Sequence, residues 1–230
     1  FDQVDREALL TAAEGGDSRA QYVWGRLHSF FYGLLNDEKE AVKWYRKSAE
    51  QGYAMAQNNL AYLYAHGRGA AKNEVEAVKW YRKAAEQNHT ASQTFLADMY
   101  ETGRGVAKDD VEAVKWYRKA AEQGYAWGQS NLGAMYEAGR GVAKDGAEAV
   151  KWYRKAAEQD YAGAQDSLGV MYANGRGVAK DEVEAVKWFR KAAEQDHAPG
   201  QNNLGRMYGN GRGVAKDEKE AVKWCRKAAE

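Results

Sequence analysis

The chain has 230 residues, with 34 Lys and Arg against 33 Asp and Glu, so its formal net charge is only +1. This balance argues against a nucleic-acid-binding protein, which needs a surplus of basic residues to displace counterions from phosphates. A single cysteine, Cys225, excludes an internal disulfide and any metal site built from several cysteines. No apolar run approaches the ~18 residues that a membrane-spanning helix requires, so we expect no membrane insertion.

Tryptophan recurs at a fixed interval along the chain. Six tryptophans stand 36 residues apart from one another: Trp44, Trp80, Trp116, Trp152, Trp188 and Trp224. A period of this length is typical of arrays built from pairs of helices. The composition of 24 Gly and 1 Pro favours helices joined by tight turns. The sequence therefore predicts an all-α fold, an α/α solenoid of six helix-turn-helix repeats that forms a single domain over residues 1–230.

The first predicted element is a helix over residues 3–14. It aligns with the second helix of a repeat, with Ala8 and Leu9 in the places of Trp and Tyr. With the turn after it, this helix forms an N-terminal half-repeat over residues 1–16. Because single units cannot bury their apolar faces alone, we expect the repeats to be stabilised by stacking. Six full repeats follow, with predicted boundaries at 17–52, 53–88, 89–124, 125–160, 161–196 and 197–230.

Each repeat begins with a helix that we name the A helix. In the fourth repeat Gly128, Leu132, Met135 and Tyr136 follow one another at helical spacing. Gly-Arg-Gly comes after this helix in five repeats, whereas the first repeat, with Phe31-Tyr32-Gly33, keeps only the last glycine. The motif is similar to phosphate-binding loops, but it follows a helix rather than a strand. We therefore interpret it as a turn.

The second helix of each repeat, the B helix, carries one apolar stripe, such as Ala113, Tyr117 and Ala120. Asp or Asn stands before every B helix and Glu follows three residues later, which predicts a capping box. In that motif the Asp or Asn accepts bonds from the first amides and the Glu reaches back. The residues after the B helices tolerate a left-handed backbone, which predicts helix ends there: Gly16, Gly52, Asn88, Gly124, Asp160 and Asp196.

The last B helix ends the sequence at Glu230 without a polar capping helix. We expect either that the natural chain continues or that this face packs on another molecule. Cys225 occupies a position that holds Tyr or Phe in the other B helices, so we interpret it as a small buried residue.

The stretch over residues 126–158, from Ala-Trp-Gly-Gln to Arg-Lys-Ala-Ala-Glu, resembles the Sel-one-like repeat, a relative of the tetratricopeptide repeat. The resemblance covers nearly all of residues 17–230, although Trp24 and His28 depart from the pattern. It implies a right-handed superhelix with A helices on the concave side and B helices on the convex side. It also implies an interaction scaffold, common in bacterial envelope, secretion and signalling systems and in endoplasmic-reticulum quality control. The periplasm or cell envelope is slightly favoured over the cytoplasm.

Some positions of the A helix barely change between repeats, and others vary. The unchanging positions include a column of glutamines that we interpret as structural: Gln21, Gln57, Gln93, Gln129, Gln165 and Gln201. The varying positions lie along one face of the helix. In the second repeat they hold Met55, Asn58, Asn59, Tyr62, Ala65 and His66. If the A helices line the concave side, as the resemblance implies, this face is a groove.

The varying face supplies the candidate partner-binding residues. Aromatic side chains, including Phe30, dominate early in the chain and amides dominate late, which suits an extended or helical segment of another protein. Asn59, Asn131 and Asn203 share one column, and an amide can both donate to and accept from a peptide backbone. Related tetratricopeptide proteins use such asparagines as a clamp; the alternative is that they are solvated surface residues. The candidates are Tyr22, Arg26, Asn59, Tyr62, Phe95, Asp98, Trp127, Asn131, Asn203 and Arg206.

No candidate catalytic group stands out from the repeats, so we do not expect an enzyme. His66 is the only histidine on the varying face and has no second ligand beside it, so neither a metal site nor a cofactor is expected. The leading hypothesis is a non-catalytic scaffold that binds a partner protein or peptide in the groove. One alternative is an immunity-type protein that blocks a toxic enzyme. Another is an envelope scaffold in polysaccharide handling or secretion, with the loop arginines on an anionic glycan.

Overall fold

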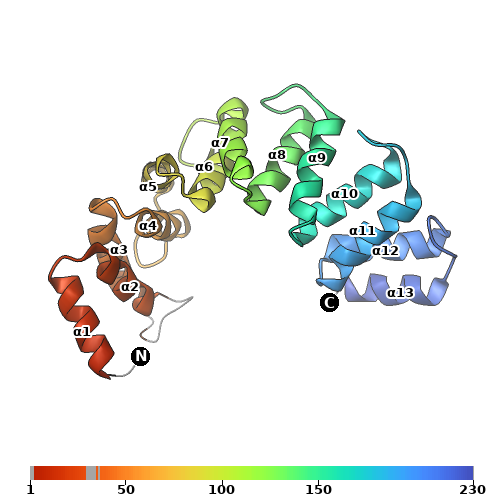
Figure 1. Ribbon diagram of the computed structural model, residues 1–230. Helices are drawn as coiled ribbons and strands as arrows, with labels where there is room; N and C mark the ends of the chain where they lie inside the picture. The colour runs from red at the N-terminus through yellow and green to blue at the C-terminus, as the bar shows by residue number, and fades with distance from the viewer. Residues whose placement is uncertain (1–2, 30–34, 36, 230) are drawn as a thin grey trace. The chain divides into compact units, whose positions relative to one another are not determined.

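The computed structural model describes residues 3–29, 35 and 37–229. Every regular element in this part of the chain is an α-helix, which confirms the predicted fold class (Figure 1). None of these helices is long and apolar enough to cross a membrane. The thirteen helices are α1 (Gln3–Glu14), α2 (Ser18–His28), α3 (Glu38–Glu50), α4 (Ala54–His66), α5 (Glu74–Glu86), α6 (Thr90–Thr102), α7 (Asp110–Glu122), α8 (Ala126–Ala138), α9 (Gly146–Ala157), α10 (Ala162–Asn174), α11 (Glu182–Glu194), α12 (Ala198–Asn210) and α13 (Glu218–Lys227).

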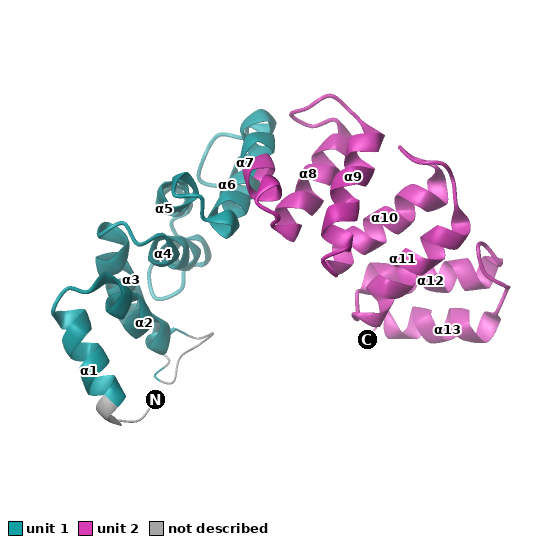
Figure 2. Ribbon diagram, in the orientation of Figure 1, with its two compact units in different colours: residues 1–116 teal, residues 117–230 magenta. Residues whose placement is uncertain are grey.

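The chain divides into two compact units, unit 1 over residues 1–116 and unit 2 over residues 117–230, and the boundary falls within α7 (Figure 2). The even-numbered helices are A helices, and the odd-numbered helices from α3 onward are B helices. In unit 1 each helix from α1 to α5 contacts the one that follows it, and in unit 2 the same holds from α8 to α12. The A helices α10 and α12 also touch directly. That residues 1–230 form a single domain stays a prediction.

Small residues let neighbouring helices approach closely, both within a repeat and between successive repeats, as the sequence predicts. A Cβ atom on Gly128 would lie 2.7 Å from the Cβ of Ala120, and one on Gly133 would lie 2.9 Å from the ring of Tyr153. The apolar stripe of the B helix is buried, with Ala149 and Ala156 fully covered. The helices can lie this close together only because Gly and Ala stand at the contact points, and the larger side chains beside them fill the remaining space.

The predicted helix starts are confirmed, but the capping box is wrong in one respect. Asp145 has an extended backbone and its Oδ1 accepts from the amides of Ala147 and Glu148 at 2.9 and 3.0 Å. The glutamate does not reach back: the Glu148 carboxylate accepts from Lys151 Nζ at 2.9 Å. The backbone amide of Asp145 donates instead to the carbonyl oxygen of Tyr136 at 3.0 Å, so the glutamate carboxylate pairs with the lysine one turn further along the helix. The same Glu–Lys pair recurs at Glu40, Glu76, Glu112, Glu184 and Glu220.

The turns have the backbone that the sequence predicts. Asn88, Asp160 and Asp196 adopt φ values of 64°, 59° and 57°, and the glycines at the corresponding positions are also left-handed. In each Gly-Arg-Gly both glycines have positive φ. A Cβ on Gly69 would clash with the carbonyl oxygen of Glu38, so the motif is a close-packed turn, as interpreted.

The glutamine column is structural, as predicted, and it links neighbouring repeats. Each glutamine is buried and its Nε2 donates to a backbone carbonyl eight residues earlier, as Gln165 does to Ala157 at 3.1 Å. In the first, second, fourth and fifth repeats its Oε1 also accepts from a glutamine just after the B helix of the same repeat, as Gln195 Nε2 donates to Gln165 Oε1 at 2.8 Å. Equivalent bonds join Gln51 to Gln21, Gln87 to Gln57 and Gln159 to Gln129.

Cys225 contradicts its prediction, because it is exposed. The equivalent Phe189 lies on α11, which packs between α10 and α12, and only 3% of Phe189 is exposed. Helix α13 packs mainly on α12, and none of its described residues is buried. The residue pattern of α13 is that of the other B helices. However, α13 is not packed between two A helices as α11 is, so Cys225 is exposed.

Candidate functional site

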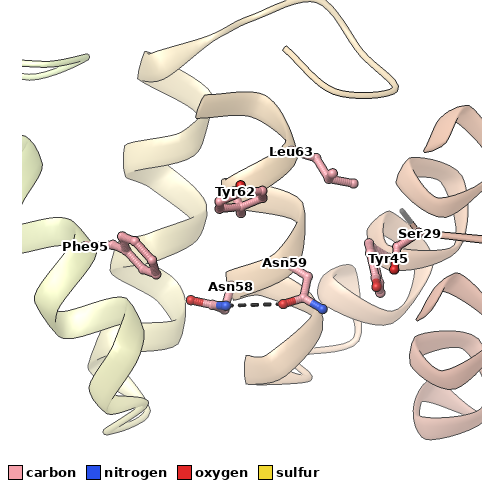
Figure 3. A pocket seen from close by; sticks show the side chains of 7 residues that line it. All are labelled: Ser29, Tyr45, Asn58, Asn59, Tyr62, Leu63 and Phe95. Atoms are coloured by element: carbon pink, nitrogen blue, oxygen red, sulfur yellow. Dashed lines mark hydrogen bonds between the residues drawn. The ribbon is translucent and has the colours of Figure 1, made fainter. Parts of the chain in front are cut away.

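A pocket opens in unit 1 beside the A helices α4 and α6. Its volume is about 310 Å³. It brings together three of the predicted residues, Asn59, Tyr62 and Phe95 (Figure 3). The remaining lining residues are Ser29, Tyr45, Asn58 and Leu63. No charged side chain lines this pocket among the residues that the structure describes. Aromatic rings and side-chain amides make up most of its lining.

Two of the three aromatic rings that line the pocket, those of Tyr62 and Phe95, stack on neighbouring rings. The Tyr62 ring lies 4.0 Å from the His66 ring, one turn further along α4. The Phe95 ring lies 5.1 Å from the buried ring of Tyr81 on α5. Figure 3 shows the two rings arriving at the pocket from neighbouring A helices. Both side chains are partly exposed, so each ring can contact a ligand. Because stacking already holds the rings in place, binding costs little side-chain entropy.

The amides of the pocket are also positioned by neighbours. Asn58 Nδ2 donates to Asn59 Oδ1 at 3.2 Å (Figure 3), and Asn58 Oδ1 accepts from Ser92 Oγ at 2.9 Å. Burial raises the pKa of the Tyr45 hydroxyl, although hydrogen bonds to Ser29 and Asn59 oppose the shift. The hydroxyl therefore keeps its proton at neutral pH. Together these groups present donors and acceptors, as an unpaired peptide backbone requires.

Sequence reasoning missed Ser29, Tyr45 and Leu63 as pocket residues. Tyr45 and Leu63 belong to positions that barely change between repeats, and both are buried for most of their surface. Variation between repeats therefore carried no signal for them. Ser29, which aligns with Ala65, and Asn58 lie in varying columns, so that signal was present for both of them.

The other candidates of unit 1 lie outside the pocket lining. Tyr22 on α2 lies 5.1 Å from the ring of Tyr53, and the Arg26 guanidinium lies 5.8 Å from the centre of the Tyr22 ring. Asp98 on α6 forms an ion pair with Arg104 of the following turn. Phe30 and the Phe31-Tyr32-Gly33 segment lie outside the described residues.

The candidates of unit 2 fall on two different helices. Trp127 and Asn131 are partly exposed and stand one turn apart on α8. Asn203 and Arg206 line a pocket beside α12, and Asn203 Nδ2 donates to Asp166 Oδ1 at 2.8 Å. Burial raises the pKa of the Asp166 carboxyl, opposed by this hydrogen bond and by His197. Asn59 and Asn203 therefore share a column but have different partners.

Histidine has packing roles near the ends of the A helices. Ser92 N donates to His89 Nδ1 at 3.2 Å, and burial lowers the pKa of His89. No group of three or more His, Cys, Asp or Glu side chains that could hold a metal ion occurs within residues 3–29, 35 and 37–229.

A family model, the Sel1 repeat, matches six successive segments of the chain: residues 18–53, 54–89, 90–125, 128–161, 162–197 and 198–230. No curated protein matches the sequence. Among solved structures, c5321, a protective antigen of uropathogenic Escherichia coli with an SLR fold, is 38% identical with a TM-score of 0.89. The match covers 97% of this chain but 48% of that one, so this chain spans about half its length.

Two further solved structures are similar to this chain. A Sel1 repeat protein from Oxalobacter formigenes is 36% identical with a TM-score of 0.87, over 94% of this chain and 86% of that one. The immunity protein PA5088 of Pseudomonas aeruginosa is 22% identical with a TM-score of 0.60, over 92% and 80%. The second likeness is one of fold alone. With six matched repeats and the helix pairs described above, the chain belongs to the Sel1 repeat family.

Proposed function

We propose that this chain is a non-catalytic scaffold that binds a segment of a partner protein in the pocket of unit 1. Sel1 repeat proteins generally mediate protein–protein interactions, and the family is generally non-catalytic. The observation that carries the proposal is the pocket itself, in which stacked rings and hydrogen-bonded amides meet without a charged group. Such a lining suits recognition more than chemistry, which requires a nucleophile, an acid or a base.

The size of the pocket limits what it holds. Its volume of about 310 Å³ is at the lower end of the roughly 300–1,000 Å³ of small-molecule sites, so it admits one or two side chains rather than a whole helix. An apolar or aromatic side chain placed against Tyr62 and Phe95 would remove both rings from water. Anchors of this kind supply most of the affinity of protein interfaces, about 2 kcal/mol or more each.

The amides determine the form of the bound segment. Asn59 lies beside the rings and carries both donor and acceptor atoms, which match the N–H and C=O groups of an extended backbone. A helical segment satisfies its own backbone groups and has no need of them. We therefore infer an extended segment with an apolar anchor residue.

The test is capture of the partner by the full chain carrying a photo-crosslinking residue in place of Met55, which is 47% exposed on α4. In that background, Tyr62→Ala combined with Phe95→Ala should weaken binding of the identified partner about tenfold or more, since both anchors are lost. Val75→Ala, an exposed apolar truncation on α5, is the matched control and should leave binding unchanged. A folded double variant with undiminished binding would refute the site.

An immunity-type function is the second candidate, and the fold likeness to immunity proteins such as PA5088 is what favours it. Under that hypothesis the partner is a toxic enzyme encoded nearby, and co-expression should protect cells from it. A polysaccharide-handling role receives less support, because the loop arginines are engaged: Arg68 pairs with Glu38 and Arg212 with Glu182.

A further inference from the structure

A second pocket lies in unit 2, beside α10, α11 and α12, and has a volume of about 210 Å³. Phe189 and Met207 are buried, so with Val170 they form an apolar floor. The polar lining residues are more exposed and form a rim: Asn174, Asn203, Arg206, Asn210 and Arg212. This pocket therefore differs in character from the aromatic pocket of unit 1.

The two arginines of the rim are in different electrostatic states. The Nε and a terminal nitrogen of Arg212 donate to the Glu182 carboxylate at 2.9 and 2.8 Å, which compensates its charge. Arg206 is exposed, and no hydrogen bond or ion pair joins it to another residue in the described part of the chain. Asp166 is outside the lining and bonds to Asn203. The rim thus presents one uncompensated guanidinium, with five N–H donors available.

The amides of the rim offer the complementary atoms. Asn174 Nδ2 donates to the carbonyl of Val170 at 3.0 Å, and Asn203 Nδ2 donates to Asp166 at 2.8 Å. These bonds orient both amides through their nitrogen atoms, which leaves their oxygens to accept from a ligand N–H. A cation, amide acceptors and an apolar floor together match an amino-acid residue that bears a carboxylate.

We propose that this pocket binds a carboxylate of the partner polypeptide, from its C-terminal residue or from an Asp or Glu side chain. The inference rests on the proposed function only in that the ligand belongs to a protein. The carboxylate pairs with the Arg206 guanidinium, and the apolar part of the ligand covers Val170 and Met207. A phosphate group is the poorer match, because its second charge would face no uncompensated cation.

The experiment is a titration of the full chain, followed by NMR of the Arg206 Nε–H and the Asn203 side-chain amide. N-acetyl-leucine supplies a C-terminal carboxylate, and N-acetyl-glutamate α-amide supplies a side-chain carboxylate. N-acetyl-leucinamide has the same apolar part without the charge. At least one carboxylate probe should shift both signals, and the tighter of the two identifies the source. Equal binding of the leucinamide or of inorganic phosphate, or no shift with either carboxylate, would overturn the proposal.

Two variants make the assignment specific. Arg206→Gln should weaken binding of the better carboxylate probe about tenfold, because a charge-assisted pair is lost. Arg226→Gln, an exposed arginine of α13 outside the pocket, is the matched control and should bind as the unaltered chain does. Since Arg206 is exposed, the melting temperature should not change, and equal weakening by both variants would exclude a role specific to Arg206.

The outcome is separable from that of the proposed function. Loss of partner capture in the Tyr62 and Phe95 variants without any probe binding at Arg206 retains the unit 1 site and rejects this one. Probe binding that depends on Arg206, with partner capture independent of Tyr62 and Phe95, does the reverse.

Discussion

At the scale of single residues, the buried glutamines show how a polar side chain is used as a structural part. Gln165 is fully buried, yet its Nε2 and Oε1 are both bonded, to the Ala157 carbonyl and to Gln195. A buried amide without partners would be costly, and here the partners are supplied at fixed places by the repeat itself. Gln165 thus joins three segments of the chain, and the glutamines that align with it all donate to the same carbonyl position eight residues earlier.

Replacing Gln165 by Leu should therefore destabilise the protein. The change leaves the Ala157 carbonyl without its side-chain donor and removes the acceptor of Gln195, which should cost about 1–3 kcal/mol of unfolding free energy. Urea unfolding followed by circular dichroism measures it. Asn202→Leu, an amide exchanged for Leu at an exposed position of α12, is the control and should change stability by less than about 0.5 kcal/mol. Equal effects of the two changes would contradict the argument.

The ion pairs of the loop arginines differ between repeats. Arg68 and Arg212 each pair with a glutamate 30 residues earlier, Glu38 and Glu182. Gly146 occupies that place for Arg176, which instead pairs with Glu137 at 2.8 Å. The Tyr153 hydroxyl donates to the same glutamate at 2.8 Å, so Glu137 draws a B-helix tyrosine into a polar contact.

At the scale of the helix, the ends are set by local chemistry. Every B helix from α3 begins after an Asp or Asn whose side chain accepts from an amide of the first turn. The A helices lack this device at most of their starts, and they end instead at a left-handed glycine. A local signal at one end is therefore enough for most of the A helices, because packing fixes the rest.

The cap of α9 gives a test at this scale. Asp145→Ala removes the acceptor of two amides and should reduce stability by about 1 kcal/mol. Asp145→Asn retains an oxygen acceptor at the same place and should recover most of the loss. Thermal unfolding of the two variants under the same buffer conditions compares them, and an Asn variant as unstable as the Ala variant would show that the cap is not the cause.

At the scale of the molecule, the stability of each repeat should depend mainly on the repeats next to it. The helix contacts within each unit join successive elements, so a repeat depends on the repeats that touch it and little on distant ones. Opening of one repeat should then remain local, unlike the all-or-none unfolding of a small globular domain.

Leu204→Ala tests this locality. Leu204 is fully buried in a cluster with Phe189 and Met207, so its truncation should cost about 2–5 kcal/mol. Hydrogen exchange measured by mass spectrometry should show faster exchange in α11, α12 and α13. Exchange in α2, α3 and α4 should be unchanged. A uniform increase along the whole chain would indicate a cooperative unit larger than neighbouring repeats.

The sequence by itself determined the helices, their ends and their repetition. These features depend on residues close together in the chain: Asp or Asn at the cap, Gly or Asn in a left-handed turn, apolar residues at helical spacing. It also indicated the face of the A helix that carries Asn59, Tyr62 and Phe95. Their role as a binding site is a proposal that the pocket supports.

Only the tertiary structure decided which side chains meet across repeats. Tyr45 lies on a B helix and still lines the pocket of Asn59, and Asn203 bonds to Asp166, which is 37 residues away. Cys225 is exposed because α13 packs mainly on one neighbouring helix, and the residue pattern of α13 alone does not reveal this. Local patterns fix backbone shape, whereas pockets and burial arise from the distances between separate helices, which packing alone sets.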